Sequence, residues 1–445
     1  MSSFLPFLLT VLFLLPSIAL AIVINSKTFN YIIGGFSEGM LDEGNNMFYN
    51  DLPYKYHPFV LCISGTVSAY TFNGIGFTLA LRLERRLVWQ ANRDKPVSEN
   101  STVTFGRNGN LVLANAQGQM VWQTNTANKG VVDLKVLSNG NLVLIDRRGS
   151  IVWQSFDHPT DSLLVGQSLL PGDKNKLTSR LSPFDNLRKG PYSLVMDGGR
   201  MLFYYQSKQS PEQEIYSQMQ NINPESPGNI LAKMTLQSEP VENEPYFFIL
   251  KFNFTSIDSA STSTSPLGLE LKFNTTYSYL QLGQDGNFRI YTYFDKVNDT
   301  TTRPPWDETF TMFSRRRFYE SECQLPLRCG EFGVCEDNQC VACPTPKGLM
   351  GWSTRCAPPK LPPCSSQSGI NVDYYKIVGV EHFSSNFSGN GPIKLLDCKA
   401  KCSKDCTCLG FFYRKTTSTC LLTPQLSTLT RVSNSSHLAF IKIAK

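Results

Sequence analysis

Residues able to perform chemistry are sparse in this sequence, and the most suggestive pattern lies at residues 35–39. These residues read Gly-Phe-Ser-Glu-Gly, which fits the G-x-S-x-G pattern that places a nucleophilic serine, here Ser37, on a turn between a strand and a helix. An apolar run at residues 31–33 could supply the strand. No helical pattern follows it, and no alternation of strands and helices surrounds it, so we assign no catalytic residue and expect a protein that is not an enzyme.

The other reactive side chains form no recognisable metal or cofactor site. The four histidines show no spacing typical of metal ligands. Cys340 and Cys343 have the spacing of a zinc or redox pair, but they lie among many other cysteines, where a disulfide is the expected role. We therefore expect no metal and no cofactor.

The 13 cysteines are placed unevenly along the chain. Cys62 stands alone in an apolar run and is expected to be a small buried side chain in a strand. The other 12 lie between residues 323 and 420, an even number as a disulfide framework needs. Sequons of the form N-x-S/T occur at Asn100, Asn253, Asn274, Asn298, Asn386 and Asn434. Disulfides and N-glycans both indicate an extracellular glycoprotein.

The N-terminus has the pattern of a secretory signal peptide. Residues 4–15 are almost continuously apolar, and Ala19 and Ala21 form an A-x-A cleavage signature, so removal of residues 1–21 is expected. The alternative is an uncleaved membrane anchor, which the early Pro16 disfavours. No second apolar stretch follows, so we expect a secreted, soluble protein without a stable membrane anchor.

Length and charge narrow the class further. A chain of 445 residues is too long for one core and indicates roughly three domains. The formal net charge of +6 is small for this length, and the basic residues are dispersed. Nucleic-acid binding would need a stronger basic footprint, so no nucleic-acid partner is expected. The small excess of basic residues gives the protein a slight preference for polyanionic partners such as acidic polysaccharides.

An internal repeat organises the first part of the chain. Trp-Gln pairs recur at residues 89–90, 122–123 and 153–154, and the hairpin sequence Asn-Gly-Asn-Leu-Val-Leu occurs at residues 108–113 and 139–144. Asn-Gly is a strong hairpin signal because both residues tolerate positive φ. The repeat predicts an all-β structure in which the three tryptophans share a core. Further strands and turns are expected at residues 191–205 and 277–293.

The cysteine-rich part follows a boundary near residue 317. Residues 323–356 hold six cysteines in a segment too short to build its own core, so disulfides must stabilise it. A stiff proline-rich linker follows at residues 358–363. The spacing of Cys398 and Cys402 predicts a helix over 394–402, and that of Cys406 and Cys408 predicts a strand over 407–413.

Several of these segments resemble known plant modules. Residues 89–97 (Trp-Gln-Ala-Asn-Arg-Asp-Lys-Pro-Val), the Asn-Gly hairpins and residues 153–164 resemble the bulb-type mannose-binding lectin domain. Residues 329–335 resemble the EGF-like module of S-locus glycoproteins, and residues 402–413 resemble a PAN/apple module. The order of modules, with the phrases at residues 124–132 and 375–383, is similar to the plant epidermis-specific secreted glycoprotein family.

The resemblance implies a mainly β fold: bulb-type lectin β-prism domains built from Trp-Gln repeats, then a small EGF-like module and an α+β PAN/apple module. The expected ranges are 1–21 for the signal peptide, 22–58 for an N-terminal arm, 59–178 for the bulb-type lectin domain, 179–318 for a second lectin-like β domain, 322–357 for the EGF-like module and 364–445 for the PAN/apple module.

The resemblance also implies a disulfide pairing, which spacing alone cannot select. The expected pairs are Cys323–Cys335, Cys329–Cys340, Cys343–Cys356, Cys398–Cys420, Cys402–Cys408 and Cys364–Cys406.

The family's sugar motif, Q-x-D-x-N-x-V-x-Y, is incomplete in every copy. Two copies retain only Asn108 with Asn110 and Asn139 with Asn141 among the polar positions, and a third retains Asp285, Asn287 and Tyr291. The losses favour turn chemistry over sugar binding for each copy. The third copy is the best remaining candidate, although Arg289 replaces the small valine and could pair with Asp285 and fill the pocket.

We therefore expect a secreted cell-wall or other extracellular glycoprotein that acts by binding, with degenerate mannose motifs. Its partners would be cell-wall glycans or extracellular proteins. Two alternatives stay open: a functional mannose-binding lectin, and a soluble receptor-like protein that binds other proteins through its PAN and lectin surfaces.

Overall fold

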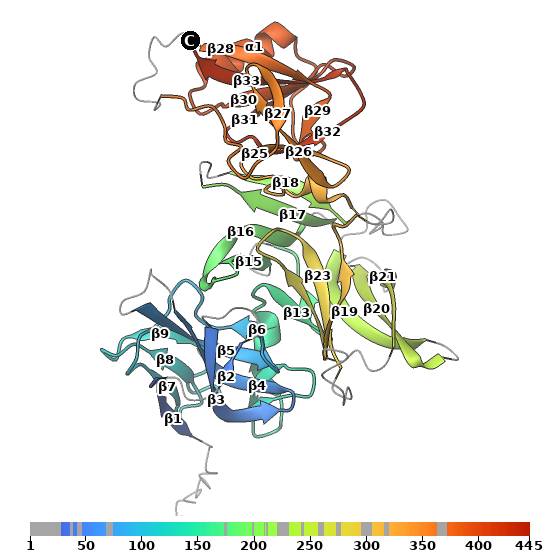
Figure 1. The fold of residues 1–445 in the computed structure, drawn as a ribbon. Helices are drawn as coiled ribbons and strands as arrows, with labels where there is room; N and C mark the ends of the chain where they lie inside the picture. Colours follow the sequence, from blue (N-terminus) through green and yellow to red (C-terminus); the bar gives the residue numbers. More distant parts are fainter. Residues whose placement is uncertain are drawn as a thin grey trace, which may run out of the picture.

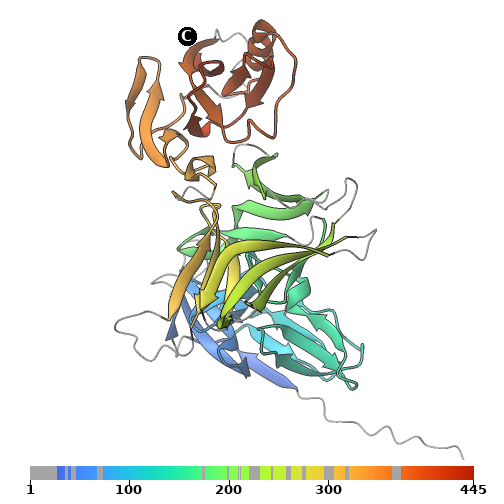
Figure 2. The same ribbon diagram turned by 90° about the vertical axis from the view of Figure 1, so that its right-hand side faces the viewer.

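The structure of the protein is a computed structural model in which the chain forms three bodies in sequence order (Figure 1). A first prism lies at one end, a second prism lies in the middle and a C-terminal module lies at the other end, as the turned view also shows (Figure 2). The described residues are 28–35, 39–41, 47–67, 74–172, 176–197, 200–208, 210, 212–219, 231–241, 244–256, 262–272, 277–294, 305–315, 320–362 and 372–445.

The first prism consists of three antiparallel sheets. Their strand orders are β2-β3-β4-β5-β6, β1-β7-β8-β9 and β10-β11-β12. The strands are β1 (Phe29–Ile32), β2 (Gly39–Met40), β3 (Met47–Tyr56), β4 (Phe59–Val67), β5 (Ile75–Leu83), β6 (Arg86–Gln90), β7 (Thr102–Phe105), β8 (Leu111–Ala114), β9 (Met120–Gln123), β10 (Val131–Val136), β11 (Leu142–Asp146) and β12 (Ile151–Gln154). A short 3-10 helix, η2 (Ser155–Asp157), follows β12.

The segment expected as a separate N-terminal arm, residues 22–58, instead contributes strands to the first prism. Strand β1 pairs with β7, and β3 pairs with β4 through a turn at residues 57–58. Ile33 and Leu52 from this segment are almost completely buried in the prism core. The expected boundary at residue 58 was therefore wrong, because these strands satisfy the backbone groups of neighbouring sheet edges.

The three tryptophans of the Trp-Gln repeats meet in one cluster, which confirms the expected shared core. Trp89, Trp122 and Trp153 pack edge to face, with ring centroids 6.0, 6.1 and 5.9 Å apart. Trp89 is buried, whereas Trp122 and Trp153 are only partly buried. One end of the cluster therefore reaches the protein surface.

The second prism consists of three four-stranded sheets. Their orders are β13-β22-β23-β24, β14-β19-β20-β21 and β15-β16-β17-β18. The strands are β13 (Ser162–Leu164), β14 (Ser168–Leu169), β15 (Leu177–Ser182), β16 (Asp185–Asp197), β17 (Arg200–Gln206), β18 (Gln213–Gln218), β19 (Leu231–Val241), β20 (Glu244–Ser256), β21 (Thr262–Lys272), β22 (Ser278–Leu282), β23 (Phe288–Tyr293) and β24 (Trp306–Thr311).

This prism begins earlier than the expected boundary at residue 179. Strands β13 and β14 precede that position, yet β13 pairs with β22 and β14 pairs with β19. Leu163 and Leu169 are completely buried in the core of the second prism. Residues 162–172 and 176–178 thus belong to the second prism by strand pairing, although Leu164 packs in the core of the first.

The C-terminal module contains two sheets and one α-helix among the described residues. The sheet orders are β27-β26-β25-β32-β29 and β28-β33-β30-β31. The elements are η3 (Glu322–Gln324), β25 (Phe332–Glu336), β26 (Gln339–Thr345), β27 (Gly348–Gly351), β28 (Val372–Val378), β29 (Val380–His382), α1 (Leu395–Lys404), β30 (Gly410–Arg414), β31 (Thr419–Thr423), β32 (Ser427–Arg431) and β33 (His437–Ala444). No helix of the described residues is long and apolar enough to cross a membrane.

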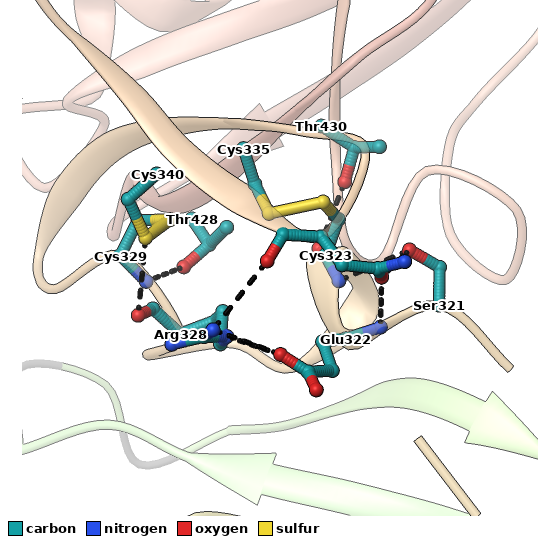
Figure 3. Close-up of a disulfide and its surroundings, with 10 residues drawn as sticks. Ser321, Glu322, Cys323, Arg328, Cys329, Cys335, Cys340, Thr428 and Thr430 are labelled. Atoms are coloured by element: carbon teal, nitrogen blue, oxygen red, sulfur yellow. Dashed lines mark hydrogen bonds and ion pairs between the residues drawn. A yellow bond between two sulfur atoms is a disulfide. The ribbon is translucent and has the colours of Figure 1, made fainter. Parts of the chain in front are cut away.

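The EGF-like and PAN-like segments share one sheet. Strand β25 of the former pairs in parallel with β32 of the latter. Figure 3 shows how side chains reinforce this join: the Thr428 hydroxyl accepts from the Cys329 backbone N–H, and the Thr430 hydroxyl donates to the Cys323 carbonyl, both at 2.9 Å. The two segments therefore form a single unit.

Five of the expected disulfides are formed in the structure. They are Cys323–Cys335, Cys329–Cys340, Cys343–Cys356, Cys398–Cys420 and Cys402–Cys408. Cys406 is also disulfide-bonded, and its expected partner, Cys364, lies outside the described residues. Cys62 is a buried thiol in β4.

The strand expected over residues 407–413 was wrong at its start. Strand β30 begins at Gly410, and Cys406 and Cys408 lie in the connection after α1. The Asp405 carboxylate accepts from the backbone N–H and the hydroxyl of Thr407, at 2.8 and 2.7 Å. This side-chain contact stabilises a turn where the cysteine spacing suggested a strand.

Candidate carbohydrate-binding site

The third motif copy lies on the hairpin of β22 and β23 in the second prism. In its turn, the Asp285 carboxylate accepts from the Asn287 backbone N–H at 3.0 Å. The Asn287 side chain is 3% exposed. Its Nδ2 donates to the Phe313 carbonyl at 2.8 Å, and its Oδ1 accepts from the Phe313 N–H at 3.0 Å and from the Phe288 N–H at 2.8 Å. Asn287 therefore holds the hairpin against the chain that follows β24.

The Arg289 side chain pairs with the Asp285 carboxylate of this copy, as the position of Arg289 in the motif suggested. Its guanidinium donates to both carboxylate oxygens of Asp285, at 2.9 and 2.6 Å. Burial alone would raise the Asp285 pKa, but the hydrogen bonds and the charge of Arg289 outweigh burial and lower it. Glu308 lies 3.5 Å from the same guanidinium. A sugar hydroxyl would have to compete with this bidentate pair for the carboxylate.

Tyr291 faces a different environment from Asp285. Arg289, Tyr291, Tyr279 and Gln281 line a cavity of about 200 Å³, and neither Asp285 nor Asn287 lines it. This volume is below the roughly 300–1,000 Å³ of typical ligand pockets. Burial raises the pKa of Tyr291, so its hydroxyl stays protonated at neutral pH. The structure does not bring the three candidate groups together in one cavity.

The first two motif copies use their asparagines in the same way as the third. The exposed Asn108 accepts from the Asn110 N–H at 3.1 Å, and the partly buried Asn139 accepts from the Asn141 N–H at 3.2 Å. Each pair forms the tight turn that an Asn-Gly sequence favours, with Gly109 at φ +77°.

The side chain of the second asparagine of each pair forms hydrogen bonds at or just after the end of the strand that completes the hairpin, β9 or β12. Asn110 is 5% exposed; its Nδ2 donates to Gln123 at 2.8 Å, and its Oδ1 accepts from the Thr126 N–H at 3.0 Å. Asn141 is 4% exposed, and its Nδ2 donates to Gln154 at 2.8 Å. The motif asparagines at these positions are internal contacts of the prism.

A buried charged cluster, to which the sequence pattern assigned no role, joins the two prisms. The Asp161 carboxylate accepts from Arg93 of the first prism at 2.8 Å and from Arg180 of the second at 2.7 Å. The side-chain amide of Gln281 completes the cluster, with its Nε2 donating to the Asp161 carboxylate at 2.9 Å. Burial would raise the Asp161 pKa, but the two arginines hold it well below its usual value. Sequence spacing gives no signal for this cluster, because its four members come from four separate segments.

Comparison of the chain with known proteins shows the family to which it belongs. A family profile described as D-mannose binding lectin matches residues 86–184. EP1-like glycoprotein 1 of Arabidopsis thaliana is 43% identical over 417 residues, which cover 89% of this chain and 85% of the relative. The chain belongs to the EP1-like family of plant glycoproteins. The epidermis-specific secreted glycoprotein EP1 of Daucus carota is 42% identical over 406 residues, covering 85% of this chain and 99% of the relative.

The EP1-like chain is a secreted, lectin-like glycoprotein with a bulb-type lectin domain and disulfide bonds, as the sequence predicted. Solved structures of monomeric monocot mannose-binding lectins from Gastrodia elata share 18% sequence identity with this chain. The structural alignment covers 29% of this chain and 96% of the lectin chain, with a TM-score of 0.18.

Three of the six sequons of the EP1-like chain lie at positions whose exposure the structure describes. Asn100, Asn386 and Asn434 are exposed, so their side chains are open to glycan attachment. Asn253 lies in β20. Asn274 and Asn298 lie outside the described residues, as does Ser37 of the G-x-S-x-G pattern.

Proposed function

We propose that this EP1-like glycoprotein acts by binding in the cell wall or elsewhere outside the cell, without catalysis, and that its mannose motifs have become structural. One observation carries the proposal: the motif residues Asn110, Asn141 and Asn287 are buried and hydrogen-bonded to the protein itself. The pairing of Asp285 with Arg289 supports it at the third copy. The lectin-type fold favours a glycan partner over a nucleic acid.

A functional mannose-binding lectin is the alternative that Asp285 and Tyr291 keep open. It requires Arg289 to leave the Asp285 carboxylate when a sugar arrives, which would break a bidentate charge-assisted contact. A soluble receptor-like role, with proteins bound through the PAN-like and lectin-like surfaces, remains the second alternative.

A carbohydrate microarray tests the proposal with the purified, glycosylated protein. The array should carry mannose-terminated glycans beside neutral and acidic cell-wall polysaccharides. We expect binding to cell-wall glycans and none to mannose-terminated ones. Strong mannose binding would favour the lectin alternative, and no binding to any glycan would favour the receptor-like one; either result would overturn the proposal.

A further inference from the structure

A second and larger cavity lies at the open end of the tryptophan cluster. Its volume is about 440 Å³, within the range of roughly 300–1,000 Å³ that ligand pockets occupy. Trp89, Trp122 and Trp153 line it from the first prism, and Lys189 lines it from the second. The cavity therefore combines aromatic walls with a cation.

The three Trp-Gln units that meet here differ in how their polar atoms are used. Both polar atoms of the Gln90 amide have protein partners, since its Nε2 donates to Thr78 at 3.1 Å and its Oε1 accepts from Arg93 at 3.0 Å. Gln154 is also engaged, because its Oε1 accepts from Asn141 at 2.8 Å and its Nε2 donates to Asp157 at 2.9 Å. In both units the amide oxygen and the amide nitrogen each have a protein partner.

Gln123 is different. Its Oε1 accepts from Asn110 at 2.8 Å, which fixes the orientation of the amide, and its Nε2 has no acceptor among the described residues. The neighbouring Trp122 Nε1 likewise has no acceptor there, whereas Trp89 Nε1 donates to the His158 carbonyl at 2.8 Å. Both Trp122 and Gln123 line the cavity, so each brings to it an N–H donor that has no acceptor within the described part of the chain.

The three indole rings also differ in how far other side chains cover them. The His158 ring stacks on Trp153 with centroids 5.3 Å apart and an interplanar angle of 17°. Trp122 contacts the other two indoles only edge to face and is partly exposed. Trp122 therefore offers an indole surface against which the apolar C–H face of a sugar ring can pack.

The charge of the cavity favours an anion. No carboxylate occurs among its described lining residues. The Lys189 side chain is 59% exposed, and its ammonium forms a salt bridge with Asp94 at 2.9 Å. An ammonium carries three donors, so this contact leaves further N–H groups for a ligand.

We propose that this cavity binds a uronate residue of an acidic oligosaccharide. The sugar's apolar face would pack on Trp122, while its carboxylate and hydroxyls accept from Trp122 Nε1, Gln123 Nε2 and Lys189. This inference rests on the proposed binding role but uses a site that contains none of the mannose-motif positions. The uronate site and the proposed function can therefore be disproved independently of each other.

Titration calorimetry of the full glycoprotein with a short oligogalacturonide tests the inference, and the matched probe is the same oligosaccharide with its carboxyl groups reduced to alcohols. We expect the acidic probe to bind at least tenfold more tightly than the reduced probe, and to weaken as salt is added. Equal binding of both probes, or binding of neither, would overturn the proposal. On the microarray, binding of neutral cell-wall glycans would then still support the proposed function.

Two variants locate the site, each with a control. Trp122→Phe keeps an aromatic ring but removes the donor, and should weaken binding by about tenfold; Lys189→Gln should weaken it by about fivefold. Trp306→Phe and Lys135→Gln make the same changes outside the cavity and should bind like the wild type. Thermal unfolding checks that all four variants are folded. If folded Trp122→Phe and Lys189→Gln bind as their controls do, the assignment of the site is wrong.

Discussion

The structural role of the motif asparagines gives a prediction that can be worked out from single contacts. Asn110→Ala removes the acceptor of the buried Thr126 N–H and the donor to Gln123. An orphaned buried donor costs about 1–3 kcal/mol, and a lost neutral hydrogen bond costs about 0.5–1.5 kcal/mol. We therefore expect the free energy of unfolding to fall by about 2–4 kcal/mol, which corresponds to a decrease in Tm of roughly 5–15 °C.

Asn108→Ala is the matched control, two residues away on the same turn. Asn108 is exposed and accepts one hydrogen bond, from Asn110 N–H, which water can replace. Its substitution should cost less than about 1 kcal/mol. The assay is thermal unfolding followed by tryptophan fluorescence, because the tryptophan cluster reports on the first prism. If Asn110→Ala melted within a degree of the wild type, or if both variants lost equal stability, the structural interpretation of the motif would be refuted.

Four other predictions concern the charged groups and the disulfides. Arg289→Val frees the Asp285 carboxylate, so mannose should bind the variant more tightly than the wild type in titration calorimetry; unchanged binding would show that Arg289 is not the obstruction. Asp161→Asn should lower the free energy of unfolding by about 3–5 kcal/mol, measured by chemical denaturation, because it leaves buried arginines without their countercharge. Since the folded-state pKa of Asp161 is lowered from 3.8, its contribution to stability should be present above about pH 4 and be lost as the pH falls further, and a wild-type stability that did not fall below pH 4 would contradict this. Peptide mapping without reduction should recover Cys364 linked to Cys406, and another partner for either cysteine would disprove that pairing.

Local patterns in the sequence predicted the features that depend on near neighbours. The Asn-Gly turns fold as hairpins because Gly109 and Gly140 adopt positive φ, which other residues reach only at a cost. The three Trp-Gln pairs meet because the repeat gives each tryptophan an equivalent place around a common axis.

Features that depend on distant strand pairing could not be read from the sequence. The first-prism strands β1 and β3 lie in a segment without the repeat, so nothing local indicated their partners. The parallel pairing of β25 with β32 joins residues nearly a hundred positions apart, and only the folded chain reveals that the EGF-like and PAN-like segments form one sheet.

The candidate site was identified by residue type but not by residue orientation. The motif pattern selected Asn110, Asn141 and Asn287, yet whether an amide points to solvent or into the prism depends on the chain that packs against it. The repeat marked Trp122 and Gln123 only as core positions, and the buried Asp161 cluster gave no motif signal. In both cases the role depends on which hydrogen-bond partners the fold supplies.

Titration of the purified, glycosylated wild-type protein with methyl α-mannoside tests the central claim most directly. If the motif asparagines are internal contacts and Arg289 closes the third copy, mannose should bind with a Kd weaker than about 1 mM, a free energy of barely 4 kcal/mol. A micromolar Kd that is lost in Asp285→Asn would contradict the account and show that the protein is a working mannose lectin.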